Sequence, residues 1–462
     1  MFFKSYQNIS LLLLAFLFIN DHLISSIQLD DEILDKFIED EIQQGFPGVA
    51  LSVIQNGKVL KQKVYGYKLK YDDNGTVIDE PQLLALETMF DMASLTKMYA
   101  TNYALMHLVY QGKLNVHDPI MKYIPYYRGC NPEHECREAR LIKDLLTHTA
   151  GYASSVEFYN PKRVSADLYS QDKNKTEEII ETKLGFQRPR GDDQIPLYSD
   201  IDYMLLGLVI EHITGMRIDQ YVKSTIYQPL GLTHTLFNPV NGFNYQKTDF
   251  AATELKGNTR NNTIDFPNVR RYVLQGQVHD EKSFYSMNGL SGHAGLFSNL
   301  HDMTILTQVM LNNGTYGNVQ FWNETVQELF LTPYSRDPTY GLGWRLNYNQ
   351  TLSWFGLHAT KEAYGHTGWT GTCTVIDPKC SIAIILLTNK RHTPCINGTF
   401  DGEKYESGRY GKIMTLVYEA IQLDQQQCCN ITPINMGCRN SLENFSSLIL
   451  FSMCVITSLL IH

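Results

Sequence analysis

Ser94 and Lys97 are the residues of this sequence whose types and spacing best suit covalent chemistry. They lie in the stretch MASLTKMYATNYALMHLVYQGKL, residues 92–114. Apolar residues recur there at helical spacing and Gly112 ends the pattern, so one helix would carry both side chains on one face. A serine hydroxyl becomes nucleophilic when a neighbour withdraws its proton, and a partly desolvated lysine can do so or can stabilise the alkoxide. The helix N-terminus adds N–H groups where an oxyanion would form.

A purely structural interpretation competes with this one. Ser94 or Thr96 can cap the helix while Lys97 is solvated, and a serine and a lysine at this spacing are common in unrelated helices. The pair alone does not establish catalysis, so the surrounding sequence has to decide.

The elements expected to position this pair come from both ends of the chain. Residues 31–43 have a helical pattern, and the strands GVALSVIQNG and VLKQKVYGY meet at Asn56-Gly57, a strong hairpin signal. A second apolar strand pair, CTVIDP (373–378) and CSIAIILLTN (380–389), precedes a helical pattern at 412–423. We therefore predict an α/β (α+β) fold, an antiparallel sheet flanked by helices with an inserted mainly helical domain.

Two further stretches carry a resemblance to a known family. LYSDIDYMLLGLVIEHITG (197–215) and YGHTGWTGT (364–372) resemble the second and third motifs of the serine β-lactamase and penicillin-binding-protein superfamily. The chain is most similar to the class C β-lactamase-like branch, which includes esterases, D-aminopeptidases and D,D-peptidases. GKLNVHDPIMKYIP, IKDLLTHTAGY, GHAGLFSNLHDM and YGLGW extend the similarity in order, from about residue 33 to 422.

The resemblance implies a set of catalytic residues and no cofactor. Ser94 becomes the nucleophile, Lys97 its activating partner, and Tyr198 the residue that relays a proton to the leaving group. The third motif, His366, Thr367 and Gly368, would line the substrate cleft. The backbone N–H groups of Ser94 and Trp369 would form the oxyanion hole. No G-x-S-x-G elbow offers another serine.

Two positions depart from the β-lactamase pattern. Asp200 stands where many members have asparagine, which replaces a donor amide with an acceptor-only carboxylate. His366 replaces the lysine of the third motif, so at neutral pH the cleft is expected to lose a fixed positive charge. Both changes argue against an efficient β-lactamase or D-Ala-D-Ala carboxypeptidase, and both suit esterase or aminopeptidase-like members.

Other polar residues have structural interpretations. Ser199 to Asp202 reads as a capping box ahead of an amphipathic helix. His148 and His293 are interpreted as loop or packing residues. For the stretch 279–281 (His-Asp-Glu), contact with a ligand and ordering of a loop stay equally open.

Both ends of the chain resemble processing signals. Lys4 precedes an apolar run at 9–19 that suits a signal peptide, which we place at 1–26. An uncharged run at 445–461 follows a polar stretch, so 431–462 is predicted to be a spacer and a glycolipid-anchor signal, with a membrane-spanning helix as the alternative. Residues 27–430 would form one hydrolase domain.

The composition limits the partners. A net charge of −9 with no basic excess argues against nucleic acid. CNPEHEC (130–136) lacks the paired spacing of a zinc site, so no metal is expected. Removing the tail would leave an even set of cysteines, which suits disulfides in an oxidising compartment: Cys130, Cys136, Cys373, Cys380, Cys395, Cys428, Cys429 and Cys438. Glycosylation sequons occur at Asn74, Asn174, Asn261, Asn313, Asn323, Asn349, Asn397 and Asn430.

These features predict a secreted or surface-anchored serine hydrolase. Ser94 would attack the carbonyl of a small-molecule or peptide-like ester or amide, Tyr198 and Lys97 would move the proton, and water would release the acid. The alternative is a catalytically inactive cell-surface glycoprotein that uses the same fold as a binding or structural module. The sequence leaves the acyl group, the leaving group, the disulfide pairing and the oligomeric state open.

Overall fold

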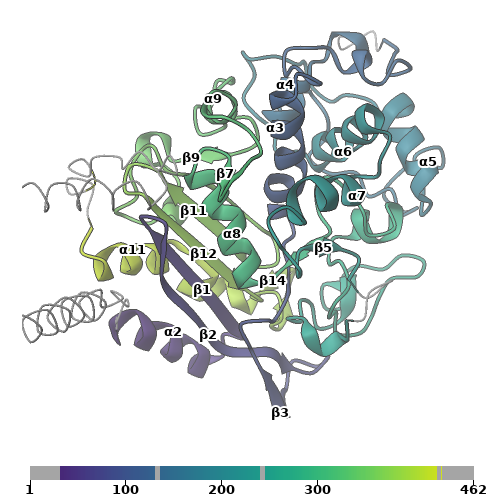
Figure 1. Cartoon of the computed structure of the whole chain (residues 1–462). Coiled ribbons are helices and arrows are strands. Elements are labelled where there is room, and N and C mark those ends of the chain that lie inside the picture. The colour runs from purple at the N-terminus through teal and green to yellow at the C-terminus, as the bar shows by residue number, and fades with distance from the viewer. Residues whose placement is uncertain (1–31, 131–135, 240–244, 424–427, 429–462) are drawn as a thin grey trace, which may run out of the picture.

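The computed structural model describes residues 32–130, 136–239, 245–423 and 428 (Figure 1). The predicted signal peptide and the predicted anchor segment lie outside these residues. Among the described residues, none of the helices combines the length and apolar character needed to cross a bilayer.

The largest element is a seven-stranded antiparallel sheet that joins the two ends of the described chain, as predicted. Its strand order is β3-β2-β1-β12-β11-β10-β9. The strands are β1 (Gly48–Gln55), β2 (Lys58–Tyr71), β3 (Val77–Leu83), β9 (Arg345–Leu346), β10 (Tyr364–Thr367), β11 (Thr372–Asp377) and β12 (Ile382–Thr388).

The β1–β2 hairpin forms where the sequence predicts it. Asn56 and Gly57 both have positive φ, 50° and 75°, which two-residue hairpin turns require and which asparagine and glycine tolerate best. Gln55 pairs with Lys58 across the turn. This turn fixes the register, so alternate β1 residues face opposite sides of the sheet.

Helices cover both faces of the sheet (Figure 1). Val49, Leu51 and Val53 of β1 belong to the core under α2 (Glu32–Gln44) and α11 (Gly411–Ala420). Ala50 and Ile54 point to the opposite core, which α8 (Leu300–Leu311) covers. The core on the α8 side is continuous with the core of the inserted helices.

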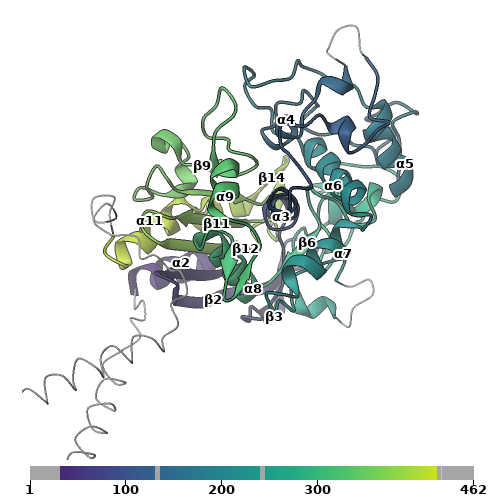
Figure 2. The ribbon, with the colours of Figure 1, turned by 45° about the horizontal axis from the view of Figure 1, so that its top comes forward.

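The insertion between β3 and β9 is mainly helical. It contains α3 (Tyr103–Tyr110), α4 (Ile142–Leu146), α5 (Lys173–Glu178), α6 (Asp200–Thr214), α7 (Ile218–Val222), α8 and α9 (Glu324–Leu331). Figure 2 looks along α3, which lies between the large sheet and α6. A small antiparallel sheet of β4 (Phe90–Asp91), β6 (Leu296–Ser298) and β5 (Leu236–Phe237) stands at its base.

Shorter elements complete the described chain. Two small hairpins are β7 (Thr315–Tyr316) with β8 (Val319–Gln320) and β13 (Cys395–Ile396) with β14 (Thr399–Phe400), and a short helix, α10 (Glu406–Arg409), precedes α11. The observed sheet and helical insertion confirm the predicted fold class.

The described residues contain two disulfides, Cys130–Cys136 and Cys380–Cys428. Cys373 and Cys395 form no disulfide with another described residue. The remaining cysteines, from position 429 onward, lie outside the described residues.

Candidate active site

Ser94 lies in a tight turn between β4 and the helical segment that becomes α3. Ala93, just before it, has φ 46°, a left-handed conformation that non-glycine residues rarely adopt. The Asp91 side chain stabilises this turn by accepting the Ala93 N–H at 2.8 Å. Lys97 then begins a π-helical turn, Lys97–Asn102, before α3 starts at Tyr103. The predicted α-helix is therefore wrong in its first part, where wider π-helical turns replace it.

The Ser94 hydroxyl is held by two donors. The Lys97 Nζ and the Tyr198 hydroxyl each lie 3.0 Å from Ser94 Oγ. Tyr198 reaches the site from the segment just before α6, whose first residue is Asp200. The three side chains that the sequence assigned to the chemistry are thus in direct contact, and their catalytic roles stay predictions.

Lys97 is a buried cation with fixed partners. Its side chain is fully buried, and its Nζ donates to Asp200 Oδ1 at 2.9 Å and to the His293 carbonyl at 3.1 Å. Burial favours the neutral amine, but the Asp200 carboxylate and the Tyr198 side chain together outweigh it, so the pKa of Lys97 is raised. Lys97 therefore carries its proton beside Ser94 at neutral pH.

The edge of β10 forms the other side of the site. Gly368 lies so close to the Ser94 segment that an added Cβ would come within 2.6 Å of the Met92 carbonyl. Burial and the charge of Lys97 lower the pKa of His366 to about 3, so its ring is neutral, as the sequence predicts. His366 Nδ1 lies 2.7 Å from the Thr367 carbonyl. These contacts pack the third motif tightly against the nucleophile.

Two residues that line the cleft, Ser94 and Trp369, have backbone N–H groups without acceptors in the described part of the chain. Unpaired N–H groups beside a serine hydroxyl suit stabilisation of an oxyanion. This role for Ser94 and Trp369 also stays a prediction.

A cavity of ≈ 340 Å³ opens over Ser94, Tyr198 and the β10 edge. Its wall includes Arg345 and Arg391, which the sequence did not single out. Arg391 is paired with Glu403 at 2.5 Å, whereas Arg345 has no carboxylate partner among the described residues. Arg345 therefore supplies a cation without a carboxylate partner among the described residues, so the cleft carries a positive charge although the third-motif residue His366 is neutral.

The aromatic residues of the wall range from buried to exposed. Trp369 is 50% exposed, and the Arg391 guanidinium stacks 3.7 Å from its ring centroid. Tyr340, Trp354 and Tyr410 also line the cavity. Together with Arg345 they form a cleft that suits a ligand with both a flat apolar face and an anionic group.

Sequence reasoning missed Lys282 and the side-chain contacts that join it to Asp200, Asp280 and His293 behind Lys97. Asp280 and Lys282 lie against Asp200, and His293 contacts Asp280 through its ring. His293 thus contacts a charged side chain in addition to its packing. Asp280, whose side chain is 20% exposed, contacts Lys282 and His293. No motif surrounds Lys282, so only the fold reveals its position.

The histidine and capping predictions near α6 have mixed outcomes. His148 is buried, 2.9 Å from Asp202 Oδ2 and packed 4.6 Å from the Tyr198 ring, which agrees with a packing role. Ser199 precedes α6, but its hydroxyl donates to the Ala153 carbonyl and makes no cap, so the predicted capping box is wrong.

One group of side chains has the spacing of a metal site. The ligand atoms of Asp200, Asp280 and His293 lie within 4.8 Å of one another. The Lys282 ammonium lies 3.2 Å from a carboxylate oxygen of each aspartate, so a protein cation already bridges the two carboxylates. Cys130 and Cys136 are joined to each other, which leaves no thiolate there for a metal.

Comparison with known proteins places the chain in a family. The Beta-lactamase family model matches residues 31–398. An N-acetylmuramyl-L-alanine amidase of Bacillus subtilis (strain 168) is 46% identical over 397 residues, covering 84% of this chain and 88% of the relative. A "Putative D-alanyl-D-alanine carboxypeptidase" of Escherichia coli (strain K12) is 46% identical over 398 residues, covering 84% and 90%.

Solved structures agree on the fold. The octameric penicillin-binding protein homologue from Pyrococcus abyssi has a TM-score of 0.60 at 20% identity, covering 85% of this chain and 78% of that one. EstCE1, a hydrolase with promiscuous acyltransferase activity, has a TM-score of 0.58 at 19% identity, covering 82% and 98%. The chain belongs to the Beta-lactamase family and is a serine hydrolase.

Proposed function

We propose that this protein hydrolyses an amide bond of peptidoglycan fragments through an acyl-enzyme on Ser94. The observation that carries the proposal is the contact of Ser94 Oγ with Lys97 Nζ and the Tyr198 hydroxyl, 3.0 Å from each. The substrate class comes from the two relatives at 46% identity, whose names specify bonds of peptidoglycan. Arg345 in the cleft supports a substrate that carries a carboxylate.

The reaction follows from the charges of the three side chains. Lys97 keeps its proton, so Tyr198 is the proposed base: once its own phenol proton has left, its oxygen takes the Ser94 proton while Oγ attacks the carbonyl carbon. The N–H groups of Ser94 and Trp369 hold the oxyanion. Tyr198 then passes the proton to the leaving nitrogen as the C–N bond breaks. Water attacks the ester, returns a proton to Ser94 through Tyr198, and releases the acid.

The first test is covalent labelling with a fluorophosphonate probe, followed by peptide mapping. Wild-type protein should be labelled at Ser94, Ser94→Ala should not be labelled, and Lys97→Ala should be labelled far more slowly at the same site. A folded wild-type protein that stays unlabelled would contradict the proposal and favour the inactive binding module.

The second test identifies the bond. A muropeptide with a complete peptide stem is incubated with the enzyme and the products are weighed by mass spectrometry. Release of N-acetylmuramic acid reports cleavage before L-alanine, and release of D-alanine reports cleavage at the end of the stem. Labelled enzyme that releases neither product, but turns over simple esters, would overturn the peptidoglycan assignment.

We also propose that the protein is exported and anchored at the cell surface. The Cys130–Cys136 and Cys380–Cys428 disulfides support an oxidising compartment. Phosphatidylinositol-specific phospholipase C should release the protein from intact cells, and glycosidase treatment should lower its apparent mass. Retention after phospholipase would favour the membrane-spanning alternative.

A further inference from the structure

Behind Lys97 the side chains form a closed ring of alternating charge. Lys97 contacts Asp200 at 2.9 Å, Asp200 contacts Lys282 at 3.2 Å, and Lys282 contacts Asp280 at 3.2 Å. Asp280 Oδ1 lies 2.8 Å from His293 Nε2, and the His293 carbonyl accepts from Lys97 at 3.1 Å. Each residue of this ring therefore touches two others.

The ring is shielded from water. The side chains of Lys97, Lys282 and His293 are at most 9% exposed, and those of the two aspartates at most 20%. Charges in such a site interact strongly and are costly when unbalanced. The position of each charge in the ring thus affects the reacting atoms.

Lys282 is held in place by its own backbone. It begins the π-helical turn Lys282–Ser286, just as Lys97 begins another. Inserted π-helical turns are frequent at functional sites. The Ser283 N–H donates to Asp280 Oδ1 at 2.8 Å, so the same turn orients both Lys282 and its carboxylate partner.

The charge balance shows what Lys282 contributes. Asp200 lies between two ammoniums, with Lys97 on Oδ1 and Lys282 on Oδ2. Without Lys282 the whole negative charge of Asp200 would act on Lys97 and would cancel much of its positive field at Ser94. With Lys282 present, Asp200 is shared between two ammoniums, and Lys97 retains an effective positive charge.

We propose that Lys282 is a positioning residue for acyl transfer, which neutralises Asp200 so that Lys97 can stabilise negative charge on Ser94 and Tyr198. The inference rests on the proposed function of Ser94, Lys97 and Tyr198. Lys282 lies 185 positions after Lys97 in the sequence and is not one of the residues that line the cavity.

Other titratable groups also face this cluster, and the test leaves all of them unchanged. His148 and His366 lie 4.6 and 6.0 Å from the Tyr198 ring, and burial lowers the pKa of each. Asp202 beside His148, Tyr203 with its ring 5.8 Å from Lys97 Nζ, and Arg345 in the cavity wall also face the cluster. Glu281 and Tyr159 act on the Lys282 ammonium.

The experiment compares the pH dependence of Ser94 acylation in four forms of the full ectodomain: wild type, Lys282→Met, Asp200→Asn and the double variant. In Lys282→Met the added negative charge should hold the Ser94–Tyr198 proton more tightly, shifting the rate profile about one pH unit upward and lowering the rate at pH 7 about tenfold. Asp200→Asn should shift the profile downward. The double variant should lie between the single variants, close to wild type.

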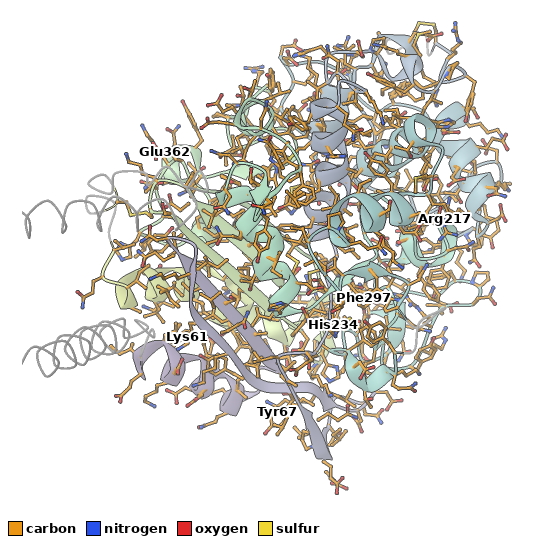
Figure 3. All side chains as sticks on the ribbon, viewed as in Figure 1. Lys61, Tyr67, Arg217, His234, Phe297 and Glu362 are labelled. Carbon is orange, nitrogen blue, oxygen red and sulfur yellow. A yellow bond between two sulfur atoms is a disulfide. The ribbon has the colours of Figure 1, made fainter. Side chains whose placement is uncertain are left out.

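Lys61→Met is the matched control. Lys61, labelled in Figure 3, lies on β2, away from α6. Its side chain is 7% exposed, and its ammonium lies 2.5 Å from the Asp35 carboxylate. It should leave the acylation profile unchanged. Circular dichroism and thermal melting establish that each variant is folded.

The outcomes separate the two proposals. Wild-type protein that is not labelled at Ser94 overturns the proposed function. Labelled wild-type protein with an unshifted Lys282→Met profile, or with equal shifts in both single variants, overturns the role of Lys282 alone. If Lys282→Met does not fold, Asp200→Asn still decides the matter, because a profile that is not shifted downward contradicts the inference.

Discussion

The charge on Lys97 determines how the nucleophile can be activated. A protonated ammonium 3.0 Å from Ser94 Oγ cannot take the serine proton, but it lowers the energy of the alkoxide and of a Tyr198 phenolate. The Asp200 contact at 2.9 Å and the neighbouring Tyr198 side chain both favour the ammonium, and together they outweigh the effect of burial. In the proposed mechanism Lys97 therefore acts by its field, and Tyr198 moves the proton.

Arg345 is expected to recognise a substrate carboxylate. It lines the cavity, opposite Gly365 in the β9–β10 pair, and has no carboxylate partner among the described residues. Arg345→Gln should lower kcat/KM about tenfold to a hundredfold for a substrate with a carboxylate near the scissile bond, since charge-assisted hydrogen bonds contribute about 1.5–3 kcal/mol. Steady-state kinetics with a matched neutral ester, which should be little affected, provides the comparison.

The control for this prediction is Arg271→Gln, which removes an arginine whose ion pair with Asp265 is exposed. It should change neither substrate. An equal loss of kcat/KM on the charged and the neutral substrate in Arg345→Gln would mean that Arg345 supports the cleft wall rather than binding charge.

His392 should make the folded state sensitive to acid. Its Nε2 accepts the N–H groups of Lys70 and Tyr71 at 2.9 and 3.1 Å, which requires an unprotonated nitrogen. Burial and the nearby Lys70 lower the pKa of His392 to about 3, against about 6.5 in the unfolded chain. Between these values the unfolded state binds one more proton, so stability falls as pH falls, by about 1.4 kcal/mol per pH unit.

The variant His392→Gln removes this titration while keeping an acceptor. Its free energy of unfolding in urea should therefore decrease less between pH 6 and pH 5 than that of the wild type, by about 1.4 kcal/mol. Both proteins keep the pH dependence of unfolding that His366 causes, because the pKa of His366 is also lowered to about 3. Identical slopes in the two proteins would contradict the assignment.

Residues of the site differ in how far sequence could place them. Ser94, Lys97 and Tyr198 stand in motifs, and their contacts agree with the predicted constellation. Lys282 and Arg345 stand in no motif, and both reach the site from segments distant in the sequence. An ion pair between such segments has no local signature, since it depends on how the elements pack.

The turn that carries Ser94 contains a residue in a strained backbone conformation. Ala93 has φ 46°, is buried, and is followed at once by the nucleophile. Ala93→Gly should be tolerated, because glycine adopts positive φ without steric cost. Ala93→Val should lower the free energy of unfolding by about 1–3 kcal/mol, because a β-branched residue is strongly disfavoured there.

The same two variants test whether the turn positions the nucleophile. Ala93→Val should also slow fluorophosphonate labelling at temperatures where it remains folded, whereas Ala93→Gly should label at a rate near the wild type. Chemical denaturation gives the stability of each. Normal labelling in a destabilised Ala93→Val protein would show that the turn serves folding and not the geometry of Ser94.

Helices were predicted better in extent than in type. The apolar pattern from Ser94 to Tyr110 indicates a helix, yet Lys97–Asn102 is π-helical. Apolar spacing reports which side of a segment is buried, and it does not distinguish these two windings over so few residues. Tyr99 and Asn102 are fully buried. Tyr99 contacts Thr374 of β11, and Asn102 contacts Tyr203 of α6. These contacts depend on tertiary packing, which no local pattern contains.

In the whole molecule, the strands near the two ends of the described chain were easier to predict than the insertion between them. β1, β2, β11 and β12 are long, apolar and bounded by turn residues, so the central sheet follows from their sequences. β4, β5 and β6 have two or three residues each, and strands so short leave no periodicity to detect. For the insertion, the family resemblance predicted what local patterns did not.

The two disulfides should stabilise the molecule unequally. Cys380–Cys428 closes a loop with a sequence separation of 48 and ties a buried residue beyond α11 to the start of β12, whereas Cys130–Cys136 closes one of 6. In the chain-entropy model the larger loop contributes about 4 kcal/mol and the smaller about 2 kcal/mol. Replacing both cysteines of each pair by serine should therefore lower the free energy of unfolding about 2 kcal/mol more for 380/428 than for 130/136.

This difference bears on where the protein can be active. Protein secreted into an oxidising compartment should unfold at a higher temperature than protein made in a reducing cytoplasm, and the Cys380→Ser/Cys428→Ser variant should remove most of that gap. Thiol mapping of the secreted protein should find all four cysteines bonded. Equal melting temperatures from the two compartments would mean that the sheet and its helices are stable without the covalent link, and the disulfides would then no longer support the proposal of export.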